Sequence, residues 1–300
     1  MKNTIVTYSV ISFMFISGII LNSCQQKPQQ QESEITEMMP SDSFHLLAVE
    51  ILPGFDNYSD ISLLLSNIEV SYYPELINSI ENVEKYLSND LLQAANIGVY
   101  VVDLAYANAF GDENATAGCY LSAISLAQNF PQVITFISNL MSDYTVGDLE
   151  IDSVLMRLEQ DLQVSVMQLT DDTEKQLYSA LLTGTFIEKI FLLYSTISRF
   201  PDATVSDTPQ NENLQRLIWI ATGQKKTLGE LNTIIEDFVI PEERLLYKHQ
   251  LNDLENHMNE ATFLRDTSMI GSAEIIQNPE FVSLYDEIMQ IRRLITEPIE

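Results

Sequence analysis

Apolar residues that recur every three or four positions constrain the fold of this chain most strongly. The spacing is clearest over residues 155–169, 177–197 and 281–295, with a shorter example over 76–87. It places apolar side chains on one face of an α-helix, because a helix turns once in 3.6 residues. The alternation typical of strands is nearly absent. We therefore expect an all-α fold, an irregular multi-helix bundle of antiparallel helical hairpins.

Capping residues mark the expected helix ends. The run Ser88, Asn89 and Asp90 is placed to cap a helix that extends to Phe110, and Gly111 is placed to end it in the left-handed conformation. Asp112 or Asn114 is placed to cap the next helix. Further helix starts are expected near Thr173, Asn213 and Pro241.

Two stretches interrupt the helical pattern, residues 44–60 and 201–212. The second contains two prolines and reads as a surface loop. We expect a main helical bundle over 42–200 and a C-terminal helical bundle over 201–300, with a single domain as the alternative.

The segment 94–110 is so apolar that we expect it to be buried on nearly all sides. It still carries Asn96, Tyr100 and Asp103, which share one helix face, and the hydroxyl of Tyr106. A buried carboxylate needs partners or a raised pKa. The four residues are therefore a candidate pocket, and a hydrogen-bonded structural row is the alternative interpretation.

The N-terminus has the layout of an export signal, with Lys2 followed by an apolar stretch over 4–21. The stretch ends in Leu21, Asn22, Ser23 and Cys24, which resembles the bacterial lipobox. That resemblance implies a signal peptide over 1–23, cleavage before Cys24 and lipid on its sulfur. An uncleaved membrane anchor and an ordinary secretory signal are the alternatives.

Residues 24–41 are polar and low in complexity, as expected of a flexible tether. Gln25 is not the aspartate that retains some bacterial lipoproteins in the inner membrane. The resemblance therefore implies a lipid-anchored envelope protein of the outer membrane. Gly98, Val99, Tyr100, Asp103 and Leu104 also form a pattern that resembles lipoproteins of Gram-negative gut and soil bacteria, a resemblance that implies no activity.

Charge narrows the set of partners. The chain has 43 acidic and 15 basic residues, a net charge of -28. Nucleic acid would be repelled, and loose adhesion to anionic lipid is disfavoured. We expect attachment to the membrane through lipid on Cys24 and an envelope protein as partner.

Catalytic and metal-binding signals are weak. His249, Asp253 and His257 share a helix stripe and are weak metal candidates, because eight helical residues rise about 12 Å and one ion cannot reach all three. Cys119 stands in a small-residue stretch typical of a buried thiol. Phosphate-binding loops and nucleophile elbows are absent from the sequence. We expect no cofactor and a non-catalytic interaction or structural module, with a small-molecule binder or enzyme using a pocket near Asp103 as the alternative.

Overall fold

The computed structural model describes residues 65, 70–127, 169, 171–200, 208–237, 247–264 and 272–297. These all belong to one compact unit, Ser41–Glu300. Every regular element in the described ranges is a helix, which confirms the all-α multi-helix fold. The signal, the tether and Cys24 lie outside the described residues, so those expectations stay predictions.

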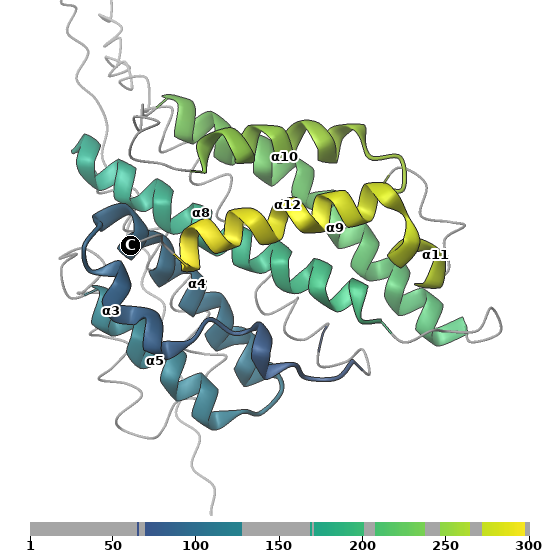
Figure 1. The fold of residues 1–300 in the computed structure, drawn as a ribbon, viewed down its shortest axis with the longest axis horizontal. Helices are drawn as coiled ribbons and strands as arrows, with labels where there is room; N and C mark the ends of the chain where they lie inside the picture. The colour runs from purple at the N-terminus through teal and green to yellow at the C-terminus, as the bar shows by residue number, and fades with distance from the viewer. Residues whose placement is uncertain are drawn as a thin grey trace, which may run out of the picture. The chain divides into compact units, whose positions relative to one another are not determined.

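The long helices pack around α8 (Figure 1). Helix α8 contacts α4, α9 and α12, while α4 also contacts α5, and α10 contacts α9 and α12. The elements are α4 (Asp90–Ala109), α5 (Glu113–Ala127), α8 (Asp172–Ser198), α9 (Thr208–Asp237), α10 (Lys248–Glu260), α11 (Ser272–Gln277) and α12 (Pro279–Thr296).

The turn between α4 and α5 follows the capping prediction. The side chain of Asn89 accepts hydrogen bonds from the first-turn amides of α4. Gly111 has φ 71°, a conformation that costs little only without a Cβ. Asp112 Oδ1 accepts from Ala115 N at 3.0 Å and so caps α5. The predicted end of one helix and the predicted start of the next are therefore confirmed.

Helix α8 is buried on all sides, since every residue from 178 to 197 is buried. By length and composition it is the one described helix that passes as a candidate membrane span. Its apolar stretch is 100% buried within the protein, as in a core helix. Its composition is therefore weak evidence for a membrane span.

Two glycines allow α4 and α8 to cross closely. A Cβ on Gly184 would overlap the backbone carbonyl of Ala95. A Cβ on Gly98 would lie 2.7 Å from Thr185 N and closer still to the Leu181 carbonyl. Real Cβ atoms do not approach backbone atoms so closely. At these two glycines the helices therefore pack backbone against backbone.

The expectation of one helix over 76–87 is wrong. The structure has two short 3-10 turns, η1 (Pro74–Leu76) and η2 (Ile80–Asn82), and one turn of α-helix, α3 (Val83–Tyr86). Ile77 and Ser79 are extended, with ψ of 138° and 130°. We call residues 72–82 the strap. Side chains of α4 bond its backbone, as described below, and these contacts replace helical hydrogen bonds.

Helix α9 begins at Thr208, earlier than the expected start near Asn213. Proline is well tolerated in a first helical turn, so Pro209 does not delay the start. One hydrophobic cluster includes residues from α4, α8, α9, α10 and α12. The expected boundary at 200/201 therefore falls inside one compact unit.

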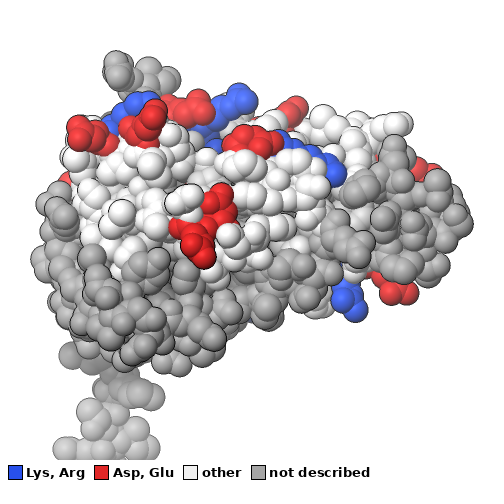
Figure 2. All heavy atoms as spheres, turned by 90° about the horizontal axis from the view of Figure 1, so that it is seen from below, with Lys and Arg blue, Asp and Glu red and all other residues white. Residues whose placement is uncertain are grey.

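Figure 2 shows one face of the molecule on which acidic and basic side chains gather mainly along one border. Most other described atoms of that face belong to uncharged residues. Charged side chains are thus unevenly distributed over the part of this face that the structure describes.

Candidate functional site

The four candidate pocket residues of α4 all bond the strap. Asn96, Tyr100 and Asp103 are 0% exposed and Tyr106 is 3% exposed. The Tyr106 hydroxyl accepts from Tyr73 N at 3.2 Å, and the Tyr100 hydroxyl donates to the Ser79 carbonyl at 2.7 Å. Asp103 Oδ2 accepts from Asn78 N at 2.9 Å, and Asn96 Oδ1 accepts from Asn78 Nδ2 at 3.3 Å. The row therefore holds a segment of the same chain in place through hydrogen bonds.

The other carboxyl oxygen, Asp103 Oδ1, is buried and has no hydrogen-bond partner among the described residues. A proton on Asp103 turns that oxygen into a donor, whereas ionised carboxylates of Asp103 and of Glu188 on α8 would repel each other. Burial raises the pKa of Asp103 well above its usual range, the negative charge of Glu188 raises it further, and Arg292 opposes both effects. The raised pKa favours the neutral form of Asp103.

Arg292 of α12 supplies the positive charge. Its Nε lies 2.7 Å from Glu188 Oε2, and its Nη2 lies 2.9 Å from Glu188 Oε1, so the pair is bidentate. Nη2 also donates to the Leu76 carbonyl at 2.8 Å. The guanidinium lies 4.1 Å from the ring centroid of Phe191. Arg292 thus joins α12 to α8 and to the strap.

The same cluster caps the end of α12. Asn96 Nδ2 donates to the Ile295 carbonyl at 2.8 Å, and the Tyr86 hydroxyl donates to the Thr296 carbonyl at 2.7 Å. Carbonyls in the last turn of a helix have no partner within it, and buried ones need one. Burial raises the pKa of Tyr86 to about 12, so its hydroxyl remains a donor at neutral pH.

Together these contacts form a polar cluster that joins α4, α8, α12 and the strap. It combines one carboxyl whose pKa is raised, Asp103, with one buried ion pair, Arg292–Glu188. The four α4 side chains and Glu188 are at most 3% exposed, and each bonds to the protein itself. This arrangement favours the structural row that the sequence left open as an alternative to a pocket.

Sequence reasoning missed four members of the cluster: Asn78, Tyr86, Glu188 and Arg292. Glu188 had a usable signal, since a charge in a helix that is apolar on all sides needs a buried partner. Its partner Arg292 stands 104 positions away and has no local signal. Asn78 was hidden because its segment was expected to be helical.

The weak metal candidates lie on exposed positions of α10. His257 Nδ1 bonds Glu287 Oε1 at 2.7 Å, and this hydrogen bond raises the pKa of His257. In the ranges that the structure describes, His, Cys, Asp and Glu form no group of three placed to hold a metal ion.

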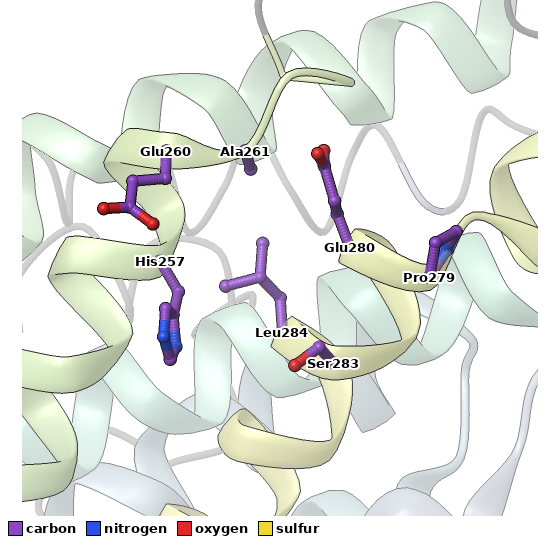
Figure 3. Close-up of a pocket in the computed structure, with 7 residues that line it drawn as sticks. All are labelled: His257, Glu260, Ala261, Pro279, Glu280, Ser283 and Leu284. Carbon is purple, nitrogen blue, oxygen red and sulfur yellow. The ribbon is translucent and has the colours of Figure 1, made fainter.

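A cleft of about 320 Å³ lies between the end of α10 and the start of α12 (Figure 3). Leu284 points into its middle, with His257 and Glu260 on one side. Glu280 accepts from Thr262 N at 2.7 Å and also from the Thr262 hydroxyl. The polar groups His257 and Glu280 are therefore already engaged by the protein.

The thiol of Cys119 is buried, as its small-residue surroundings predicted. Burial raises the pKa of this thiol, which keeps it protonated and unreactive.

No protein-family model matches the chain, and no curated protein and no solved structure matches it. The geometry of its own residues therefore carries the functional argument.

Proposed function

We propose that this chain is a lipid-anchored protein of the bacterial envelope, attached through Cys24, whose helical domain is a non-catalytic interaction or structural module. The outer membrane is the proposed location, and the proposed partner is another envelope protein. The address rests on the export signal over 1–23, the lipobox-like end at Cys24 and the polar tether over 24–41.

One observation supports the non-catalytic role most strongly. The polar side chains of α4 that were the best candidates for a pocket bond the strap and the end of α12 instead. A catalytic acid or base must reach a substrate proton, and Asp103 is 0% exposed. The small-molecule binder near Asp103 is correspondingly disfavoured.

The two cysteines allow a matched test of the anchor. We expect a Gram-negative host fed labelled palmitate to label the full chain and the Cys119→Ser variant, and to leave Cys24→Ser unlabelled. The labelled forms float with the outer-membrane fraction and resist extraction by salt. Label on Cys24→Ser, or none on the unsubstituted chain, would refute the anchor.

The role of the domain is tested separately by Asp103→Leu. If the row is structural, the variant is less stable, but its folded fraction still binds the envelope partner. That partner is first identified by proximity labelling. Loss of small-molecule binding in a fully folded Asp103→Leu variant would instead support the pocket.

A further inference from the structure

Asp103 lies in a cluster that brings two carboxyl groups close to one another. Both oxygens of the Glu188 carboxylate accept hydrogen bonds from Arg292, at 2.7 and 2.9 Å. Asp103 Oδ1 has no hydrogen-bond partner among the described residues, and Asp103 is 0% exposed. Loss of a proton from Asp103 would add a second negative charge beside Glu188, at a position with no exposed area. Such a charge is costly unless it gains a partner or water.

The described side chains around Asp103 that can carry a charge come from every helix of the cluster. They are Tyr86 on α3, Tyr100 on α4, Cys119 on α5, Glu188 on α8 and Arg292 on α12. Burial raises the pKa of both tyrosines and of the thiol, so these three are neutral at physiological pH. The guanidinium is already paired with Glu188. The strap contributes Asn78, which does not titrate. A proton on Asp103 is therefore what keeps this site free of excess negative charge.

The strap is a single layer of chain between Asp103 and solvent. Its inner side holds Asn78, whose amide donates to Asp103 Oδ2 at 2.9 Å, and its outer side holds Ile80, which is 55% exposed. Its own backbone bonds close single turns, such as Leu76 N to the Tyr73 carbonyl at 3.1 Å. Helix α8, by contrast, is continuous over 27 residues. Water therefore reaches the carboxyl at lowest cost when the strap moves and the long helices stay in place.

We propose that the strap detaches from α4 when Asp103 gives up its proton to water, which makes it a pH-sensitive switch. With the strap bonded, the protonated carboxyl is buried; with the strap detached, water solvates the carboxylate. Detachment also exposes the polar row of α4 that bonds the strap backbone. This inference is independent of the proposed lipid anchor, so either can fail alone.

The sign follows from the pKa of Asp103 in the two states. Burial and the charge of Glu188 raise this pKa while the strap is bonded, and exposure to water returns it to about 4 when the strap is detached. The bonded state is therefore fully favoured below about pH 4. It loses that advantage as the pH rises towards the raised pKa.

Amide hydrogen exchange of the full chain from about pH 5 to about pH 9 tests the switch, with each rate divided by that of the unfolded chain at the same pH. We expect the protection of Asn78 N to fall by up to about tenfold per pH unit and then to level off. Exchange at Ile190, in the buried part of α8, reports global unfolding. Asn78 should be less protected than Ile190 at every pH and less sensitive to low urea, because detachment exposes little surface.

Two aspartates that bond the strap provide matched variants. Asp103→Asn retains an acceptor for the Asn78 amide but cannot ionise, so the fall in protection with pH should disappear. Asp112 accepts from the Tyr72 hydroxyl at 2.9 Å, and hydrogen bonds lower its pKa, so it is already ionised at pH 5. Asp112→Asn should therefore leave the fall unchanged.

The unsubstituted chain decides the matter even if Asp103→Asn does not fold. Protection of Asn78 that is constant over this pH range overturns the proposal. So does equal protection of Asn78 and Ile190 with equal sensitivity to urea, because exchange would then require global unfolding. An undiminished fall in folded Asp103→Asn would assign the proton to another group and also overturn it.

Discussion

The interiors around α4 and around α10 are built differently. Around α4, the core contains a carboxyl with a raised pKa, an ion pair and two buried asparagines. The side chains of Asn78 and Asn96 bond each other, and Asn96 also bonds the Ile295 carbonyl. Around α10, the interior is mainly apolar and comes from one-sided stripes such as Leu251, Leu254 and Met258. The first region is positioned by directional bonds and close backbone contact, and the second by hydrophobic burial.

Arg292→Met should have the largest effect, because it leaves Glu188 buried without its cation. We expect a loss of about 3–5 kcal/mol in the free energy of unfolding, measured with denaturant. The control is Lys226→Met, which breaks the Lys226–Glu230 pair, whose lysine is 72% exposed; it should cost no more than about 0.5 kcal/mol. Similar losses in both variants would mean that the two regions do not differ as described.

Two glycine substitutions should change the free energy of unfolding in opposite directions. Gly184→Ala forces a methyl group into the Ala95 backbone and should cost about 3 kcal/mol. Gly223→Ala adds a methyl group in open space on a helix and should stabilise by about 0.5–1 kcal/mol. Thermal or denaturant unfolding of both variants measures the difference. A harmless Gly184→Ala would show that α4 and α8 do not cross closely.

Asp103→Asn should change how stability depends on pH. Because the folded pKa of Asp103 is raised, its stabilising contribution is complete below its unfolded pKa of about 4 and is lost as pH rises towards the folded pKa. The wild-type chain should therefore lose up to about 1.4 kcal/mol per pH unit relative to the variant as the pH rises from the unfolded pKa towards the folded pKa. The amide retains an acceptor for Asn78 and a donor for Glu188. Parallel curves would exclude a protonated Asp103.

His257→Gln should have the smallest effect. The His257–Glu287 bond raises the pKa of His257, so its contribution is present below about pH 6.5 and is lost as pH rises through the folded pKa. The histidine side chain is 51% exposed, which limits the effect to about 0.5 kcal/mol after solvent screening. Unfolding at pH 5 and pH 8 measures it, and a loss comparable to that of Arg292→Met would contradict the comparison.

Local patterns predicted the second region better than the first. The stripe over 281–295 appears in α12 as the buried residues Phe281, Leu284, Ile288, Ile291 and Ile295. The caps at Asn89 and Gly111 were also readable, because each needs only its neighbours. Periodicity failed in the strap, where contacts from α4 determine the backbone.

The candidate row could be identified from sequence, but its partners could not. Spacing alone placed Asn96, Tyr100 and Asp103 on one face of a buried helix. What they bond depends on the strap and on the end of α12, where the Ile295 carbonyl lies 199 positions beyond Asn96 in the chain. Tertiary contacts decide whether such a row of polar side chains lines a pocket or bonds another segment of the same chain.

Amide hydrogen exchange at Asn78 tests most directly whether side chains of α4 hold the strap in place. The Asn78 amide is bonded to Asp103 Oδ2 at 2.9 Å in a non-helical segment. We expect slow exchange in the wild type and in Asp103→Asn, and exchange faster by at least about tenfold in Asp103→Leu. Exchange at the rate of an unprotected amide in the wild type would contradict the account, because Asp103 would then be available for another partner.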